Sequence, residues 1–314
     1  MTAPGRRHFV AHLSEERIKA RTLTTVVCSS ALLLASTATH ADLWTWVGPD
    51  GGQYKTAANW SPASVPDLNS PDDLALLTGV AVHDAGGDLF FTSGTIEIAA
   101  GGSLTQTSGI AWMQMAGGTL KVTGGTFDQG TAGNIVRNAS TSIQVSAGVA
   151  SFSGNLIHDP ASAGALSVSG TGTINVANEF KPIADFTMNG GTLSAKLISF
   201  ADGPGSVILG GGTVVLDGAG VFSGIYPGTG SFNFLTNSTA QIFFSSYTLA
   251  DLAADGFLTN GRITLNGAVN AAAFVTTEVS GGVSVSLTPV PEPATALLAA
   301  LGLCVLQLRP RRPV

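Results

Sequence analysis

Short stretches of alternating apolar and polar residues make up the middle of the chain. Thr95–Ile98, Thr119–Val122 and Thr173–Val176 each place an apolar side chain at every second position. Alternation with a period of two predicts β-strands that bury one face and expose the other. We therefore expect half-buried strands of three to five residues, separated by glycine-rich turns.

A recurring unit of two glycines, a serine or threonine and an apolar residue opens many of these stretches. It occurs at residues 101–104, 117–120, 124–127, 190–193 and 211–214, without a fixed period. Short strands at close spacing favour a parallel β-helix of about 20 residues per coil, in which glycines permit tight corners. The predicted fold class is all-β, a parallel β-helix (β-solenoid). The alternative is a β-sandwich, which would also show alternation and glycine turns.

Tryptophans gather before this repetitive region. Trp44, Trp46 and Trp60 lie within 17 residues of each other. They could form an exposed sugar-binding platform or a hydrophobic cap over the first coil. The cap is the favoured interpretation, because an open coil exposes unpaired strand edges. We expect an N-terminal cap over residues 42–73 and a solenoid body over residues 74–225.

Residues 226–288 have a different pattern and are expected to form a C-terminal cap. Residues 248–254 predict a short helix, with Thr248 as its N-cap, Asp251 in its first turn and Gly256 at its end. Alternating apolar positions predict strands at residues 232–234, 242–244, 262–265 and 283–287.

The N-terminus predicts an export signal over residues 1–41. A basic flank at residues 17–21 precedes an apolar core at residues 23–35, and small residues at 39 and 41 fit a cleavage site. Cleavage after Ala41 would make Asp42 the first mature residue. The partner implied at this step is the secretion translocon.

The C-terminus combines an uncharged apolar run with basic residues. Residues 294–308 contain no charge. They predict a transmembrane helix of about 22 Å, shorter than the roughly 30 Å hydrocarbon core. Arg309, Arg311 and Arg312 follow, and predict a cytoplasmic stop that leaves the body on the outer side.

An extended acidic segment precedes this predicted helix. Pro291 and Pro293 restrict the backbone around Glu292 and disfavour helical geometry before residue 294. An extended peptide of this kind is readily bound by the cleft of a processing enzyme through strand-like pairing.

The motif, the apolar helix and the arginine cluster together resemble the PEP-CTERM sorting signal, here at residues 289–314. The resemblance implies a protein exported by Gram-negative bacteria that make extracellular polysaccharide. It implies transient anchoring in the inner membrane and cutting near the motif by exosortase, a membrane-embedded cysteine transpeptidase. Val290, Pro291, Glu292 and Pro293 would then be recognition residues rather than catalytic ones.

Two further segments carry weaker resemblances. The run from the strand at 232–234 through the short helix to Asn-Gly-Arg-Ile-Thr at residues 260–264 is similar to the membrane-proximal part of many PEP-CTERM proteins. The tryptophans, with the following Val65-Pro66 and Asp72-Asp73, resemble the opening of secreted bacterial β-solenoids with autotransporter-type strand repeats.

Composition and charge narrow the classes of function. Charged residues are 11% of the chain, against roughly 25% in an average soluble domain. Six basic and 18 acidic residues between Asp42 and Pro293 give that part a formal charge of −12. Such a body repels phosphate backbones, so nucleic acid is not an expected partner. Cys28 and Cys304 both lie in the terminal apolar segments, which excludes a disulfide scaffold in the body.

The side chains suited to catalysis are scattered along the sequence. Between Asp42 and Pro293, only Asp72 and Asp73 are adjacent acids, and His83 and His158 have no Cys or His at metal-ligand spacing. Each histidine is interpreted as a turn or surface residue. We therefore expect no catalytic residues, no metal and no cofactor.

These patterns predict a noncatalytic, exosortase-sorted protein of the cell surface or biofilm matrix. Its role would be structural or adhesin-like, with extracellular polysaccharide as a candidate partner. The alternative is a secreted β-helix polysaccharide lyase or hydrolase. That alternative would need three or more acidic residues lining one groove.

Overall fold

The computed structural model describes residues 41–84, 93–107, 117–130, 136–137, 142–158, 165–200, 203–217 and 230–289. These residues are mostly β-strand with almost no helix, and most of the strands build a β-solenoid. The predicted parallel β-helix is therefore confirmed over the β-sandwich. The predicted signal segment before Ala41 and the predicted helix at 294–308 lie outside the described residues.

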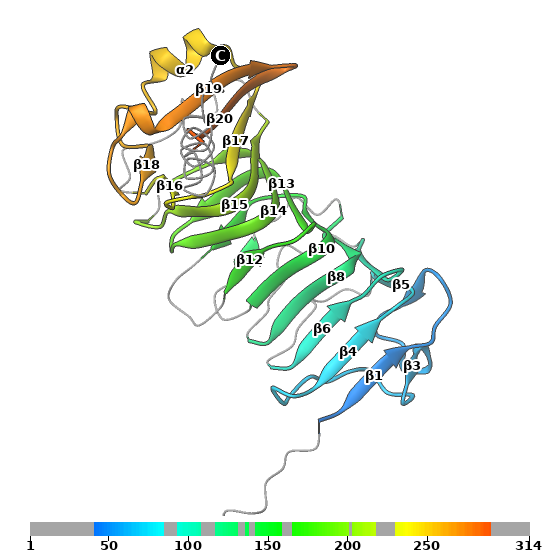
Figure 1. The fold of residues 1–314 in the computed structure, drawn as a ribbon. Helices are drawn as coiled ribbons and strands as arrows, with labels where there is room; N and C mark the ends of the chain where they lie inside the picture. Colours follow the sequence, from blue (N-terminus) through cyan, green and yellow to red (C-terminus); the bar gives the residue numbers. More distant parts are fainter. Residues whose placement is uncertain are drawn as a thin grey trace, which may run out of the picture. The chain divides into compact units, whose positions relative to one another are not determined.

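The longest row of stacked parallel strands, called row A, runs along the solenoid (Figure 1). Between β4 and β16, residues paired across neighbouring coils are 20 to 25 positions apart in sequence, close to the expected coil length. The members are β1 (Leu43–Trp46), β4 (Leu74–Leu77), β6 (Thr95–Ile98), β12 (Leu166–Val168), β16 (Phe232–Phe234), β18 (Ile263–Leu265) and the first parts of β8 (Thr119–Asp128), β10 (Ser142–Phe152), β14 (Phe186–Ile198) and β15 (Val207–Leu216).

Two further rows complete the coils. Row B contains β2 (Gly52–Gln53), β5 (Val80–His83), β7 (Ser103–Gln106), β17 (Gln241–Ser245), the first part of β13 (Thr173–Pro182) and the later parts of β8, β10, β14 and β15. Row C contains β9 (Val136–Arg137), β11 (Leu156–His158) and the ends of β13 and β14. Several strands reach 10 to 13 residues, longer than the predicted three to five, because pairing continues around the corners.

Alternating side chains of these rows fill the interior. In β4, β5, β6 and β7 every second residue is buried, as the period of two predicts. Aromatic side chains also pack within the core, with ring centroids 5.7 Å apart for Phe127 and Phe152 and 5.4 Å apart for Phe180 and Phe186. The half-buried strands predicted from the sequence are therefore confirmed.

Glycines at the corner between rows A and B account for four of the five Gly-Gly-Ser/Thr units, whereas the unit at residues 117–120 opens row A at β8. A side chain on Gly148 would overlap with the carbonyl oxygen of Gly125 in the neighbouring coil, and the φ of Gly148 is +82°. The corner thus needs both a left-handed backbone and close approach of adjacent coils. An added Cβ would also meet a backbone carbonyl oxygen of the preceding coil at Gly102, Gly125, Gly172, Gly191 and Gly212.

The N-terminal end is closed by an antiparallel strand and an aromatic cluster. β3 (Trp60–Ser61), which follows a 3-10 turn at Ala57–Asn59, pairs antiparallel with β1 on the side away from β4. Trp60 is buried and its Nε1 donates a hydrogen bond to the carbonyl oxygen of Tyr54 at 2.7 Å. Trp46 packs edge-on against Trp60 at 5.2 Å. Because Trp44 is buried too, these tryptophans offer no exposed platform for a sugar ring.

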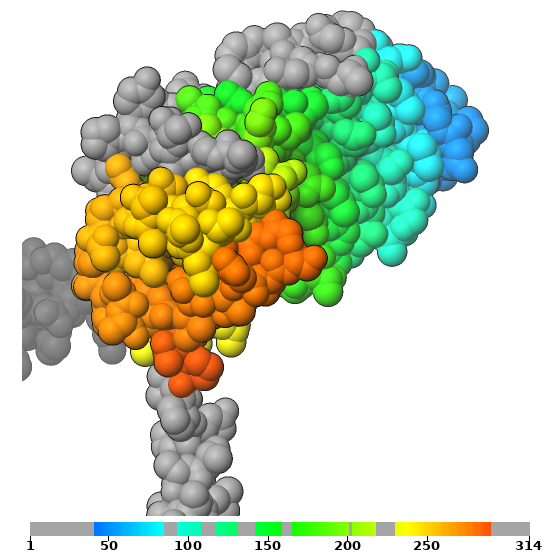
Figure 2. All heavy atoms as spheres, turned by 90° about the horizontal axis from the view of Figure 1, so that it is seen from above, coloured from blue at the N-terminus to red at the C-terminus, as the bar shows by residue number. Residues whose placement is uncertain are grey.

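The C-terminal end also changes from parallel to antiparallel pairing. β20 (Gly282–Leu287) pairs antiparallel with β17 and with β19 (Phe274–Val279), which follows a 3-10 turn at Ala271–Ala273. In Figure 2 these yellow to orange residues gather at one end of the body, and the blue N-terminal strands lie at the other.

The short helix α2 (Leu249–Asp255) matches its prediction in detail. The hydroxyl of Thr248 accepts a hydrogen bond from the amide of Asp251, and Gly256 ends the helix in the left-handed conformation. Hydrogen bonds from the Thr248 hydroxyl and then its backbone amide lower the pKa of Asp251. The sequence therefore predicted both ends of this helix.

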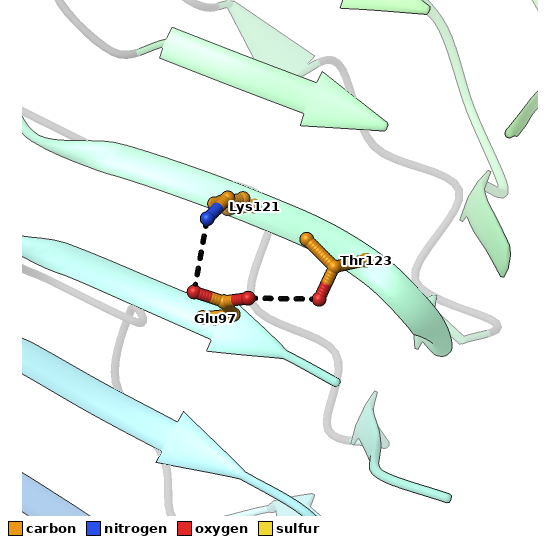
Figure 3. A network of polar contacts seen from close by, with 3 residues as sticks. All are labelled: Glu97, Lys121 and Thr123. Atoms are coloured by element: carbon orange, nitrogen blue, oxygen red, sulfur yellow. Dashed lines mark hydrogen bonds and ion pairs between the residues drawn. The ribbon is translucent and has the colours of Figure 1, made fainter. Parts of the chain in front are cut away.

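The outer face of row A carries a small polar network (Figure 3). The ammonium group of Lys121 lies 3.1 Å from Glu97 on the neighbouring strand, and the hydroxyl of Thr123 donates to the same carboxylate at 2.8 Å. Because both charged side chains are partly exposed, this pair contributes less than about 1 kcal/mol. Its main consequence is a favourable cross-strand contact that fits the parallel register.

Candidate functional site

A groove follows the corner at which row B ends. It has a volume of about 460 Å³. Its lining residues come from five consecutive coils: Asp128, Ser151, Phe152, Ser153, Asn175, Val176, Ala177, Ser194, Ala195, Lys196 and Asp217. The groove therefore crosses the strands and runs along the direction of coil stacking.

The parallel register places polar side chains in a line along this groove. Asp128 pairs with Ser151, Ser151 with Asn175, and Asn175 with Ser194. Their sequence neighbours in the strands, such as Phe127 and Phe152, are buried, so this line faces outward. Successive members are separated by the strand spacing of about 4.8 Å.

The two carboxylates of the groove stand at opposite ends. Asp128 belongs to β8 and Asp217 follows β15, four strand steps away through β10, β13 and β14. Four steps are roughly 19 Å. Glycosidases that use two carboxylates hold them about 5 to 9.5 Å apart, so this pair cannot act on one glycosidic bond.

The remaining groove chemistry is that of hydrogen bonding. Asp128 accepts a hydrogen bond from the amide of Gly130 at 2.8 Å, which fixes its carboxylate at the strand end. Serine hydroxyls, the Asn175 amide and the exposed ends of Lys196 and Asp217 offer both donors and acceptors. Among the described residues, this groove can hold a hydroxyl-rich polymer by several spaced hydrogen bonds.

The predicted sorting residues lie beyond this groove in sequence. Val290, Pro291, Glu292 and Pro293, and the arginines at 309, 311 and 312, lie outside the described residues. Ala41 is described, and it is exposed. It comes two residues before the start of β1.

The interpretation of His83 and His158 as turn or surface residues is wrong. Both are buried, at the inward-facing last positions of β5 and β11. His83 stacks against Tyr54 at 6.4 Å, and Nε2 of His158 lies 3.2 Å from the carbonyl oxygen of Asp185. Burial raises the pKa of Tyr54. Residues 80–82 are all apolar, so the sequence carried no alternation that could have placed His83 inside.

The adjacent acids of the N-terminal region also differ from each other. Asp72 is exposed, whereas Asp73 is buried and accepts hydrogen bonds from the amides of Asp42 and Ser70 at 3.2 and 2.7 Å. Sequence reasoning gave Asp73 no individual role. Its contact with Asp42 could be found only from the pairing of β1 with β4.

Two further features concern metal binding and membrane crossing in the described part of the chain. No group of three or more His, Cys, Asp or Glu side chains there is arranged to hold a metal ion. No helix there is long and apolar enough to cross a membrane. In comparisons with known proteins, no family model, no curated protein and no solved structure matches this chain.

Proposed function

We propose that the chain is an exported, exosortase-sorted protein of the cell surface or extracellular matrix, with a structural or adhesin-like role and no catalytic activity. The observation that carries the proposal is the three-part pattern of residues 289–314. The pattern consists of the Val-Pro-Glu-Pro motif, an uncharged apolar run and terminal arginines. Its resemblance to the PEP-CTERM signal makes exosortase the processing partner and the inner membrane a transient location.

The start of the folded body supports the export part of the proposal. The compact unit begins at Asp42, directly after the predicted cleavage site at Ala41, and β1 begins one residue later at Leu43. Removal of residues 1–41 would thus leave every described strand intact. The position of this boundary supports cleavage after Ala41 and export through the translocon.

The groove along row B supports extracellular polysaccharide as the matrix partner. Its line of Ser151, Asn175 and Ser194 repeats a hydrogen-bonding side chain at each coil. A polymer with repeating hydroxyl groups matches such a line better than a compact ligand does. The roughly 19 Å between Asp128 and Asp217 favours binding over hydrolysis or elimination, for which acidic groups must converge.

The export and sorting proposal is tested by the intact mass of the protein recovered from the surface of a bacterium with exosortase. We expect a mass that lacks residues 1–41 and everything beyond about Pro293. A control in a strain without exosortase should retain the C-terminal segment. If the surface protein keeps that segment in both strains, the sorting assignment is wrong.

The polysaccharide partner is tested by changing the groove. Replacing Ser151 and Ser194 together with valine should weaken cosedimentation with the producing cell's extracellular polysaccharide about tenfold. The reason is that each lost hydrogen bond contributes about 0.5–1.5 kcal/mol. The matched control replaces Ser167 and Thr187, outward-facing partners in row A, with valine and should bind normally. Equal binding by both variants would exclude this groove as the contact surface.

A further inference from the structure

Asp73 is a buried carboxylate at the N-terminal end of the solenoid. Its exposed fraction is 4%. Oδ1 accepts a hydrogen bond from the amide nitrogen of Asp42 at 3.2 Å, and Oδ2 accepts one from the amide nitrogen of Ser70 at 2.7 Å. Both donors are neutral amides, whereas buried carboxylates are normally paired with a positive charge.

The donor at Oδ1 lies at the predicted cleavage site. In the unprocessed chain, this nitrogen belongs to the peptide bond between Ala41 and Asp42 and carries no charge. Hydrolysis of that bond consumes one water, gives Ala41 a carboxylate and leaves Asp42 with an α-amino group. With an ordinary pKa of about 7.7–8.0, that amino group is largely protonated at neutral pH.

We propose that Asp73 is the binding site for the α-ammonium group of the mature chain. Removal of the export signal then converts an amide contact into a partly buried ion pair that holds β1 against the solenoid. The inference rests on the proposed function, because it requires cleavage after Ala41. Charge-assisted hydrogen bonds of this kind are roughly twice as strong as neutral ones.

The backbone already holds the new amino group in position. The carbonyl oxygen of Asp42 accepts a hydrogen bond from the amide of Leu74 at 2.9 Å, and Leu43 pairs in parallel with Leu74. The carbonyl oxygen of Asp73 itself accepts from Thr95 on the next coil. Both partners are thus fixed by the strand register, so little conformational entropy is lost when the ion pair forms.

The local sequence offers few other cations for this carboxylate. Between Asp42 and Glu97 the only lysine or arginine is Lys55. The charged side chains that adjoin the pair in sequence, Asp42 and Asp72, are both acidic. The mature α-ammonium group therefore supplies a positive charge that side chains near Asp73 in sequence do not.

The test compares two exported forms of the full chain. One has the native junction, and the other carries a Ser-Gly insertion between Ala41 and Asp42, which restores a neutral amide at Asp42. Each is made with Asp73 and with Asp73→Asn, and urea unfolding is measured on the mature proteins. We expect the insertion to lower the equilibrium constant for folding about tenfold with Asp73 and to change it little with Asp73→Asn.

The possible results separate this inference from the proposed function. If intact mass shows a first residue other than Asp42, both the cleavage assignment and the ion pair are wrong. If the mass begins at Asp42 and the insertion has no effect in the Asp73 protein, the ion pair alone is overturned, and export stands.

A second measurement covers the case in which Asp73→Asn fails to fold. The ion pair stabilises the fold while the amino group is protonated, so its contribution is complete below about pH 7 and lost as pH rises above 8. The stability difference between the native and inserted forms should therefore be present at pH 6 and absent at pH 10.5. A difference that is equal at both pH values would contradict the inference.

Discussion

Replacing Gly148 with alanine should destabilise the solenoid by about 2–5 kcal/mol. Part of this cost, about 1–2 kcal/mol, comes from forcing an L-residue into the left-handed region, because the φ of Gly148 is +82°. The rest arises because the new Cβ would overlap with the backbone of Gly125 in the adjacent coil, and overpacking costs about 1–3 kcal/mol or more. Urea unfolding followed by far-UV circular dichroism would measure the change.

Gly281 provides a matched control for this prediction. Its φ is +84°, almost equal to that of Gly148, but an added Cβ would meet no atom within 4 Å. Gly281→Ala should therefore carry only the conformational cost of about 1–2 kcal/mol. Equal destabilisation by the two substitutions would show that close stacking of the coils is not what requires glycine at residue 148.

The fold class could be predicted from the sequence because glycine-rich corners and alternating strands are both visible there. Four of the five Gly-Gly-Ser/Thr units lie at the corner between rows A and B, the fifth opens row A at β8, and the alternation after them marks the buried positions. Both signals are local, so they can be read without knowing which coils are neighbours. Helix α2 was predictable for the same reason, since Thr248, Asp251 and Gly256 define its ends within a few residues.

Features that depend on contacts between coils could not be predicted from local sequence patterns. The groove combines Asp128, Ser151, Asn175 and Ser194, which are about one coil apart in sequence and meet only through the parallel register. The continuation of β14 around its corners also depends on pairing with β13 and β15. Local propensity cannot provide a register between segments 20 or more residues apart.

The buried polar residues show a second limit of sequence reasoning. His83 and His158 were interpreted as turn or surface residues, although each occupies a buried, inward-facing position at the end of its strand. Asp73 lies directly before β4, where its buried carboxylate accepts hydrogen bonds from the backbone amides of Asp42 and Ser70. The residues that precede the two histidines in their strands are all apolar, so no alternation in the sequence marked which positions face inward.

Replacing Pro293 with alanine, or Glu292 with glutamine, should abolish C-terminal processing and leave the protein in the inner membrane. The expected loss of released protein is at least tenfold, because the proposed function makes these residues the recognition motif of exosortase. Pro293→Ala also frees the backbone to adopt helical geometry before residue 294, which removes the extended shape that a processing cleft binds. Cell fractionation followed by intact mass would measure retention and cleavage.

Pro289→Ala provides the control for these variants. It makes the same proline-to-alanine change next to the last described strand, β20, but outside the Val290–Pro293 motif. We expect normal release of this variant, because the residues proposed for recognition are unchanged. Trapping of all three variants would indicate that any relaxation of this linker prevents release, whereas normal release of Glu292→Gln and Pro293→Ala would refute the sorting assignment. Retention of the two motif variants alone would establish that the enzyme recognises the motif itself, since the solenoid and the predicted membrane segment have the same sequence in all three proteins.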